Sequence, residues 1–231
     1  MTILLRVLCL LGGYAFGLIE TGVLYGKIKG VDLRKYGSGN SGTTNALRVL
    51  GPKAGLVVFI GDFCKSFIPC LVANLVLRHF YPDTYLLFVI YLGFGAVMGH
   101  IFPFYLGFKG GKGIATTGGA IVGLLNPWMI LILLALFVLT LAVTKYMSVA
   151  SIPLMTGITV MYAILLFINK LCFDMAVPSS KAAGIESLVI IACITGIAIY
   201  KHKANIVRLM NHEENRFTFK KTVKTDEDEA K

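Results

Sequence analysis

The sequence WMILILLALFVLTLAVT (residues 128–144) carries no charged side chain and is long enough to cross the hydrocarbon core of a bilayer as an α-helix. Six other long apolar segments flank it along the chain. We therefore predict seven membrane-spanning helices, over residues 3–26, 54–79, 84–106, 114–126, 128–144, 149–169 and 185–200. The fourth is short for a span, and a tilted helix, a re-entrant helix and one continuous with the fifth across Asn126-Pro127 all remain open.

The overall composition is that of a helical membrane protein. Hydrophobic residues make up 56% of the 231 residues and charged residues only 15%, whereas soluble domains average about 45–50% and about 25%. The alternating ten-residue segments of a membrane β-barrel are missing. We predict an all-α polytopic membrane protein with one integral membrane domain, residues 1–217. The charged tail, residues 218–231, lacks apolar periodicity and is expected to be disordered.

The net charge of +10 is unevenly distributed, and this predicts the orientation of the chain. Seven spans place the two termini on opposite sides of the membrane. Most lysines and arginines between the spans fall on the side of the C-terminus, which the positive-inside rule assigns to the cytoplasm. The prediction is an N-terminus outside and a cytoplasmic C-terminus in the inner (plasma) membrane. The basic loops are expected to meet anionic lipids, and nucleic-acid binding is not expected because no aromatic-basic module is visible.

The segment GSGNSGTTN (residues 37–45), followed by Arg48, combines glycines with hydroxyls, amides and a positive charge. Glycines let an anion approach backbone N–H groups, and an arginine offers phosphate a bidentate fork. A flexible polar loop is the alternative, but the density of donors favours a phosphate site. The Walker order GxxxxGK[ST] is absent. The candidates here are Gly37, Ser38, Gly39, Asn40, Gly42, Thr44, Asn45 and Arg48, with Thr43 as a further donor.

A second glycine segment, KGGKG, covers residues 109–113. Lys112 is framed by Gly110, Gly111 and Gly113, and a lysine held in this way at a helix start can neutralise a phosphate or a developing oxyanion. Lys109 is expected to be only a positive-inside anchor of the membrane.

A third polar element follows the last span. His202, Asn205 and Arg208 recur every third residue, which places them near one face of a helix, and Glu214 comes soon after. A basic helix lying on anionic lipid explains the spacing equally well. The predicted orientation puts this element, both glycine segments and the turn at Lys145 on the cytoplasmic face, where they could form one site.

Three ionisable residues lie inside predicted spans. Asp62 and Lys65 are one turn apart and are expected to pair, and Glu20 is expected near the cytoplasmic end of the first span. The sequence lacks a GxSxG elbow, a zinc motif and the histidine–aspartate pair that many acyltransferases use as a general base. No metal and no organic cofactor is predicted.

Three motifs, in this order, resemble those of the bacterial acyl-phosphate:glycerol-3-phosphate acyltransferase family, PlsY. They are the run from Gly37 to Gly51, the run from Gly99 through His100, Phe102-Pro103 and Phe108-Lys109-Gly110-Gly111-Lys112-Gly113 to Ala115-Thr116, and the set His202, Asn205-Ile206, Arg208-Leu209 and Glu214. The resemblance covers almost the whole chain, including the number of spans.

The resemblance implies a seven-helix enzyme whose motifs face the cytoplasm. It would transfer a fatty acyl group from acyl-phosphate to the sn-1 hydroxyl of glycerol 3-phosphate, giving lysophosphatidic acid and inorganic phosphate. This would be the first acylation of phospholipid synthesis, without direct use of acyl-CoA or acyl carrier protein. The implied partners are acyl-phosphate, glycerol 3-phosphate and membrane lipids, with an upstream enzyme that makes acyl-phosphate as a further candidate.

The resemblance also carries roles onto residues. The catalytic candidates are Ser38, Arg48, Lys112, His202 and Asn205. The substrate-binding candidates are Gly37, Gly39, Asn40, Gly42, Thr44, Asn45, Gly110, Gly111, Gly113, Ser148, Arg208 and Glu214. For the serine that follows Lys145-Tyr146, both Ser148 and Ser151 fit the family position.

The chain departs from the family pattern at three positions. His212 lies where a glycine is usual, Ser66 where glycine is common, and Glu20 where the first helix often carries proline. The charged and amide positions of the motifs are intact. The alternative function is a transporter or channel for a phosphorylated solute, in which the same loops form an anion gate. Against it, the polar segments gather on one face, and no inverted repeat is apparent.

Overall fold

The computed structural model describes residues 2–168 and 180–218, and over these residues it contains helices and loops but no β-strand. The predicted disordered tail lies outside the described residues from position 219 onward. The helices are α1 (Thr2–Gly17), α2 (Thr21–Ile28), η1 (Leu33–Lys35), α3 (Thr43–Leu50), α4 (Pro52–Phe80), α5 (Tyr85–Ile101), η2 (Phe104–Leu106), α6 (Ile114–Gly123), α7 (Pro127–Thr144), α8 (Met147–Ile168), α9 (Lys181–Lys201) and α10 (Lys203–Met210).

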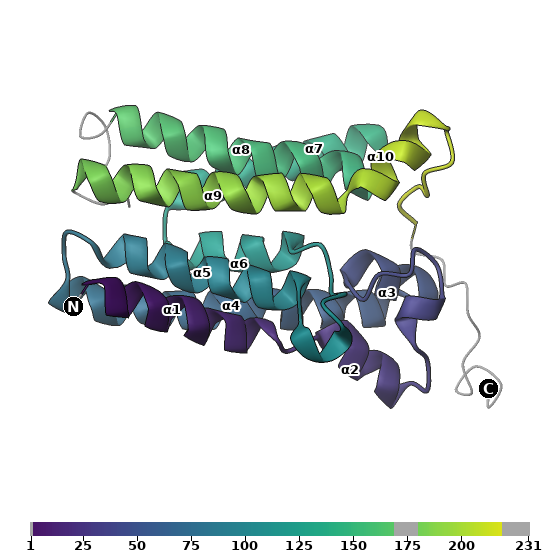
Figure 1. The fold of residues 1–231 in the computed structure, drawn as a ribbon. Helices are drawn as coiled ribbons and strands as arrows, with labels where there is room; N and C mark the ends of the chain where they lie inside the picture. The colour runs from purple at the N-terminus through teal and green to yellow at the C-terminus, as the bar shows by residue number, and fades with distance from the viewer. Residues whose placement is uncertain (1, 169–179, 219–231) are drawn as a thin grey trace.

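The long helices form two layers (Figure 1). One layer contains α1, α4, α5 and α6, and the other contains α7, α8 and α9. The short helices α2, α3 and α10 lie together at one end, and the N-terminus lies at the opposite end. Both glycine segments therefore meet the turn at Lys145 and the third polar element at the same end of the protein.

Glycines bring α1 and α5 into close contact. An ideal Cβ on Gly13 would lie 2.0 Å from Leu92 O, and one on Gly17 would lie 2.2 Å from Ala96 O. On the facing helix, Cβ atoms at Gly95 and Gly99 would come within 2.1 Å and 2.3 Å of backbone oxygens of α1. Each helix thus presents a GxxxG pair to the other, the pattern by which helices approach closely in a membrane.

The helix α5 lies at the centre of the protein. In the most apolar stretch of residues Tyr85–Leu106, which contains α5, 72% of the residues are buried within the protein. The share in the corresponding stretch of α7 is 11%. The α5 side chains Leu87, Val97 and Ile101 contribute to one hydrophobic cluster that also includes Met155 of α8 and Ile194 of α9. This cluster joins the two layers, while the outer face of α7 remains apolar and exposed, as expected for a surface in contact with lipid.

Six helical segments among the described residues are long and apolar enough to cross a membrane. They correspond to every predicted span except the fourth. That span appears as α6, which has 10 residues and is shorter than the roughly 20 residues of a typical span. It is a helix separate from α7, because Asn126 caps the start of α7 by accepting a hydrogen bond from Met129 N and Pro127 follows at the first helical position.

The first predicted span is wrong in one respect. The apolar run Ile3–Ile28 is interrupted at residues 18–20, so that α1 and α2 are separate helices. Glu20 lies in this break, directly before the start of α2, and is 1% exposed. The predicted pair of Asp62 and Lys65 is confirmed, with 3.3 Å between Oδ1 and Nζ. Glu20 joins the same buried group, since its Oε1 lies 3.5 Å from Lys65 Nζ.

Candidate active site

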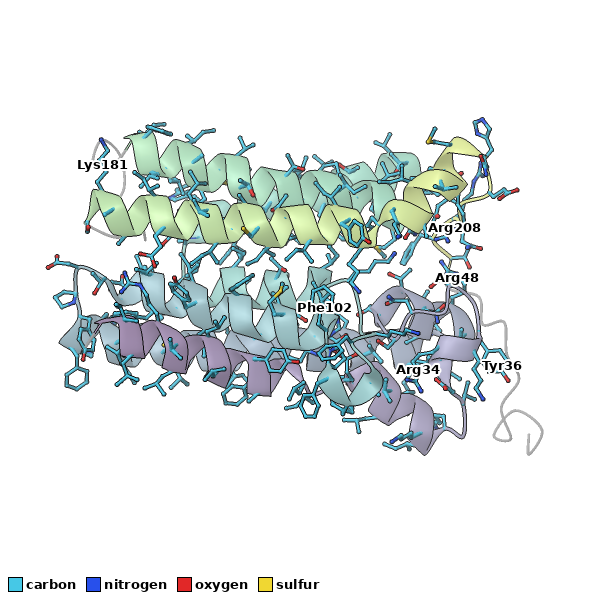
Figure 2. The ribbon with its side chains drawn as sticks, viewed as in Figure 1. Arg34, Tyr36, Arg48, Phe102, Lys181 and Arg208 are labelled. Carbon is cyan, nitrogen blue, oxygen red and sulfur yellow. The ribbon has the colours of Figure 1, made fainter. Side chains whose placement is uncertain are left out.

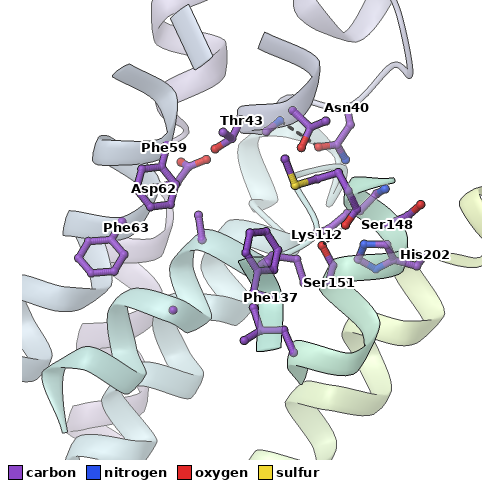
Figure 3. A pocket seen from close by; sticks show the side chains of 18 of the residues that line it. Asn40, Thr43, Phe59, Asp62, Phe63, Lys112, Phe137, Ser148, Ser151 and His202 are labelled. Atoms are coloured by element: carbon purple, nitrogen blue, oxygen red, sulfur yellow. Dashed lines mark hydrogen bonds between the residues drawn. The ribbon is translucent and has the colours of Figure 1, made fainter. Parts of the chain in front are cut away.

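A cavity of about 460 Å³ opens among the loops at the end that carries α3 and α10. Side chains from α3, α4, α6, α7, α8, α10 and the segment after α10 line it. Figure 3 shows Lys112, Ser148 and His202 grouped at one side of the cavity and Phe59 and Phe63 at the other. The cavity therefore joins a polar region at the loops to an apolar region between the helices.

The first glycine segment forms a loop that ends at the start of α3. Asn45 builds this loop: its Oδ1 accepts from Ser38 N at 2.8 Å, and its Nδ2 donates to Leu33 O and Tyr36 O at 2.9 Å and 3.0 Å. Asn40 Oδ1 accepts from Gly42 N, the residue that precedes α3. These bonds present the first turn of α3 to the cavity, where its backbone N–H groups favour an anion.

The second glycine segment packs directly on His100. An ideal Cβ on Gly110 would lie 2.0 Å from His100 O, and one on Gly111 would lie 2.0 Å from His100 Nε2. Gly113 has a φ of +83° and precedes α6. The glycines therefore let the loop lie flat against the imidazole, and Lys112 projects from it into the cavity (Figure 3).

Lys112 begins a chain of polar contacts that connects the two layers. Its Nζ donates to Asn205 Oδ1 of α10. Asn205 Nδ2 donates to Glu214 Oε1 at 2.9 Å, and Glu214 Oε2 accepts from Arg208 Nε at 2.9 Å. Arg48 also lines the cavity. At the loop end, the charges of Lys112, Arg48 and Arg208 outweigh the carboxylate of Glu214, and the cavity's other carboxylate, Asp62, is paired with Lys65. The loop end therefore favours an anionic ligand.

Figure 2 places Arg34, Arg48 and Arg208 at the loop end of the bundle and Lys181 at the far end. Of these four labelled basic side chains, three lie at the loop end.

The environment shifts the pKa values of three of these groups. Burial lowers the pKa of Lys112 to about 8, against an attraction from Glu214 that raises it. Burial and the nearby Lys112 charge lower the pKa of His202 to about 4. Burial also lowers the pKa of Arg48. At neutral pH, His202 is neutral and Lys112 is charged.

His202 is oriented by its own helix. Its Nδ1 lies 2.7 Å from Ala198 O, a contact that requires the proton on Nδ1. Because the neutral ring carries its other lone pair on Nε2, that atom is a hydrogen-bond acceptor. The ring is 3% exposed and lines the cavity.

The structure distinguishes the two candidate serines at the start of α8. Ser151 Oγ donates to Met147 O at 2.7 Å. Ser148 Oγ is buried and has no hydrogen-bond partner within the described residues. Both line the cavity, but the Ser148 hydroxyl is the one available to a ligand.

Glu214 reaches Asn205 because the chain reverses sharply after α10. His212 N donates to Leu209 O at 3.1 Å and Glu213 N donates to Arg208 O at 2.7 Å, the two bonds of a Schellman motif. His212 occupies the left-handed position of that motif, with a φ of +59°. This explains why a glycine is usual there, and it shows that the local backbone of the third motif is kept with histidine in its place.

Replacing His212 by glycine is expected to raise the melting temperature. Its side chain is exposed, so little packing is lost, and glycine removes a left-handed strain of about 1 kcal/mol. For a protein of this size that corresponds to roughly 2–4 °C, measurable by thermal unfolding in detergent. A His212→Val variant is the matched opposite and should melt lower, because β-branched residues disfavour positive φ. An unchanged melting temperature in both variants would contradict this reading.

Most of the predicted site residues converge. Twelve of them line the cavity: Ser38, Asn40, Gly42, Thr44, Asn45, Arg48, Lys112, Gly113, Ser148, His202, Asn205 and Glu214. Gly37, Gly39, Gly110, Gly111 and Arg208 do not line it. Gly37 and Gly39 shape the first loop with positive φ values, Gly110 and Gly111 pack on His100, and Arg208 holds Glu214.

The lining residues also include Asp62 and His100, which were not among the predicted site residues, and Thr43, which was predicted only as a further donor. Thr43 Oγ1 and Asp62 Oδ1 are buried without a hydrogen-bond partner within the described part of the chain. Thr43 and His100 lie inside motifs already quoted, so their position in sequence was a usable signal. Asp62 had been assigned only to its pair with Lys65.

The apolar part of the cavity is lined by α4, α6, α7 and α8 and extends toward the middle of the bundle. On α8 it runs from Ser148 through Leu154 to Ile158, which is about 15 Å at the helical rise of 1.5 Å per residue. Phe137 and Ile130 of α7 line the facing wall. The space therefore has the shape to accept an elongated apolar group whose polar end stays at the loops.

Comparison with known proteins gives consistent results along the whole chain. A family model described as glycerol-3-phosphate acyltransferase matches residues 7–212. A glycerol-3-phosphate acyltransferase from Fusobacterium nucleatum is 42% identical over 210 residues, which is 89% of this chain and 95% of that protein.

Two solved structures share the fold. A crystal structure of PlsY, an integral membrane glycerol 3-phosphate acyltransferase, in its glycerol 3-phosphate form has a TM-score of 0.76 and 33% identity, covering 92% of this chain and 96% of that one. Its lysophosphatidic acid form has a TM-score of 0.73 and 32% identity, covering 93% and 96%. From the family match and the identity over nearly its full length, the chain belongs to the glycerol-3-phosphate acyltransferase family.

Proposed function

We propose that the protein transfers a fatty acyl group from acyl-phosphate to the sn-1 hydroxyl of glycerol 3-phosphate. The products are lysophosphatidic acid and inorganic phosphate, and the reaction is the first acylation of bacterial phospholipid synthesis. The observation that carries this proposal is one continuous cavity that joins Arg48 and Lys112 to apolar walls extending about 15 Å along α8. An acyl-phosphate has the same division, with an anionic head and an apolar chain.

The membrane placement is part of the proposal. Seven spans, with α6 as the short fourth one, put the N-terminus outside and the loops with the C-terminus in the cytoplasm of the inner membrane. Support comes from the arginines at the loop end and from the opposite positions of the two ends of the described chain (Figures 1 and 2). Glycerol 3-phosphate then arrives from the cytoplasm and the acyl chain from the membrane.

Charge neutralisation and positioning supply most of the catalysis in this proposal. An acyl-phosphate is a mixed anhydride with a good leaving group, so a covalent enzyme intermediate is unnecessary. Arg48 and Lys112 neutralise the phosphates, and Ser38, Ser148 and the N–H groups at the start of α3 hold the acyl-phosphate head. Asn205, His202 and Glu214 orient glycerol 3-phosphate.

The bond changes balance without a cofactor. The hydroxyl oxygen of glycerol 3-phosphate attacks the acyl carbon, a carbon–oxygen ester bond forms, and the bond from that carbon to the phosphate oxygen breaks. The hydroxyl proton passes to an oxygen of a substrate phosphate, which makes the reaction substrate-assisted. His202 Nε2 is the rival base, because the neutral ring has a lone pair there.

Replacing His202 by glutamine is expected to lower the turnover number only modestly. Glutamine keeps a hydrogen-bonding group but cannot take up the proton, so a proton that moves to a substrate phosphate leaves kcat within about tenfold of the wild type. The measurement is kcat at saturating concentrations of both substrates. A loss of roughly 10²-fold or more, with a normal KM for both substrates, would assign the base to His202 instead.

The pH dependence of kcat/KM is expected to show a basic limb near pH 8. Lys112 has a pKa lowered to about 8, so its charge is present below that pH and is lost as the pH rises through it. His202, with a pKa of about 4, contributes no limb between pH 5 and 7. The profile should be measured with limiting glycerol 3-phosphate, which reports the free enzyme. In a Lys112→Arg variant the side chain stays protonated, so the limb near pH 8 should disappear. A limb that persists in this variant would belong to another group.

The direct test uses purified protein in detergent with palmitoyl-phosphate and glycerol 3-phosphate, assayed for lysophosphatidic acid and phosphate. Equal amounts of the two products are expected, and parallel samples with palmitoyl-CoA should give none. A folded, monodisperse sample that makes no product from either donor would overturn the proposal. Uptake of glycerol 3-phosphate by liposomes containing the protein would then test the transporter alternative.

A further inference from the structure

Four ionisable side chains form a buried cluster beneath the two glycine loops. Glu20, Asp62, Lys65 and His100 come from the α1–α2 break, α4 and α5, and each is at most 6% exposed. Lys65 Nζ lies 2.7 Å from Ile19 O, 3.3 Å from Asp62 Oδ1 and 3.5 Å from Glu20 Oε1. Burying four such groups is costly unless each is paired, and here each lies within 4 Å of an opposite charge or of the imidazole.

The cluster touches the first glycine loop through Glu20. Its Oε2 accepts a hydrogen bond from Ser41 Oγ at 3.0 Å, and both residues are at most 2% exposed. Ser41 lies between Asn40 and Gly42, which lead into α3. The backbone of Ser41 also packs directly on α2. An ideal Cβ on Gly22 would lie 1.7 Å from Ser41 O, so only a glycine fits there.

The cluster touches the second glycine loop through His100. The imidazole Nδ1 lies 3.0 Å from Glu20 Oε1 and 2.8 Å from Lys65 Nζ, so it either donates to the carboxylate or accepts from the ammonium. The Nε2 edge of the same ring faces Gly111, and Gly111 N donates to His100 O at 3.1 Å. The loop that carries Lys112 therefore rests on a ring whose orientation Glu20 and Lys65 determine.

We infer that Glu20 is a positioning residue of the active site, whose carboxylate connects Ser41 in the first phosphate-facing loop to His100 under the second. This inference rests on the proposed function. Oε2 of Glu20 accepts from Ser41 of the first loop, and Oε1 lies 3.0 Å from Nδ1 of His100, the residue on which the second loop packs. The carboxylate therefore sets the spacing between the N-terminus of α3 on one side and Lys112 on the other. Small errors in such spacing are expensive, since a displacement of about 1 Å can cost roughly 10²-fold in rate.

A purely structural role would look different. Lys65 Nζ donates to Ile19 O and so stabilises the break between α1 and α2, and Glu20 could serve only that break. Loss of Glu20 would then loosen residues 18–28 and leave the loop of residues 109–113 unchanged.

The first measurement is hydrogen–deuterium exchange of the intact protein in detergent, which does not depend on activity. Glu20→Gln should speed amide exchange in residues 37–45, where Ser41 loses its charged acceptor. It should also speed exchange in residues 109–113, because the His100 ring on which they pack loses the carboxylate beside its Nδ1. The matched control is Glu186→Gln. Glu186 also pairs with an arginine and a tyrosine, with its carboxylate 2.7 Å from Arg6 Nε and from Tyr91 OH, but it does not line the cavity. Unchanged exchange in residues 109–113 of Glu20→Gln would overturn the inference.

The second measurement is a kinetic double-mutant cycle. Glu20→Gln and Ser41→Ala should each lower kcat/KM for both substrates about tenfold or more, and the double variant should be no worse than the poorer single variant within twofold. Glu186→Gln should stay within twofold of the wild type. Losses that multiply in the double variant, or a wild-type rate in Glu20→Gln, would overturn the inference.

The outcomes separate this inference from the proposed function. A wild-type protein without product contradicts the proposed function, while the exchange experiment still decides whether Glu20 couples the two loops. Where Glu20→Gln does not fold, Ser41→Ala alone breaks the link to the first loop and leaves all four charges in place. Wild-type kinetics and wild-type exchange in Ser41→Ala would then overturn the inference.

Discussion

Replacing Lys112 by alanine is expected to lower kcat by ~10²–10³-fold, the usual cost of losing one group that stabilises charge in a transition state. Lys112 projects from a loop flattened against His100, and its ammonium contacts Asn205 across the cavity. Burial already lowers its pKa to about 8, so its charge is only partly screened by water and acts strongly on a substrate phosphate. The measurement is steady-state kinetics with both substrates varied.

Lys109 supplies the matched control for this experiment. It lies three residues earlier in the same loop and carries the same charge, but it is exposed and does not line the cavity. Lys109→Ala should keep kcat within about twofold, as most exposed charges do. Similar losses in the two variants would mean that the loop acts through its general charge, and an active Lys112→Ala would remove Lys112 from the mechanism.

Replacing Lys65 by methionine is expected to destabilise the protein by about 3–5 kcal/mol, the typical result of breaking a buried ion pair. Methionine fills most of the space of the lysine stem but leaves the carboxylates of Glu20 and Asp62 buried without their shared cation. In a protein of this size that corresponds to a melting temperature lower by roughly 6–20 °C. Thermal unfolding and size-exclusion chromatography in detergent would measure it.

Two further variants test the physical reason for that loss. Lys181→Met removes an exposed lysine at the start of α9 and should leave the melting temperature within about 2 °C. Adding Asp62→Asn to Lys65→Met should restore part of the stability, because it removes one of the two uncompensated charges. If Lys65→Met has the melting temperature of the wild type, the carboxylates of Glu20 and Asp62 do not depend on Lys65 for compensation of their charge.

The long helices were predictable from sequence because a bilayer selects for long apolar runs, whatever the tertiary packing. The predicted spans 54–79 and 128–144 agree with α4 and α7 to within two residues at each end. The break at residues 18–20 was missed because its stabilising contact comes from Lys65, 46 residues away in sequence. An apolar run gives no sign of a contact made so far along the chain.

The polar half of the site was also predictable, since the parity of the spans brings its four segments to one end. Individual roles were harder to assign. Asn45 and the pair Gly110 and Gly111 looked like ligand contacts, yet the structure engages them with the first loop and with His100. Their partners are a backbone loop and an imidazole, and both become visible only in three dimensions.

The apolar half of the site could not be picked out from the sequence. Phe59 and Phe63 of α4 and Phe137 of α7 line the cavity, but the same helices carry many aliphatic and aromatic residues that face outward. In a membrane protein both kinds of surface are hydrophobic, so the pattern that separates core from surface in a soluble helix is lost.

The two layers divide the binding groups between them. Arg48 lies on α3, which packs on α4, and Lys112 directly precedes α6, so both lie with the first layer. Ser148 lies on α8, and His202 and Asn205 follow α9, so these three lie with the second layer. The cavity thus follows the seam between the two layers, and each layer carries one part of the site. A slight sliding of one layer against the other would change the gap between the two parts without disturbing either. Under the proposed function, the seam would let a long-chain product leave sideways into the lipid while Arg48 and Lys112 stay in place for the next pair of substrates.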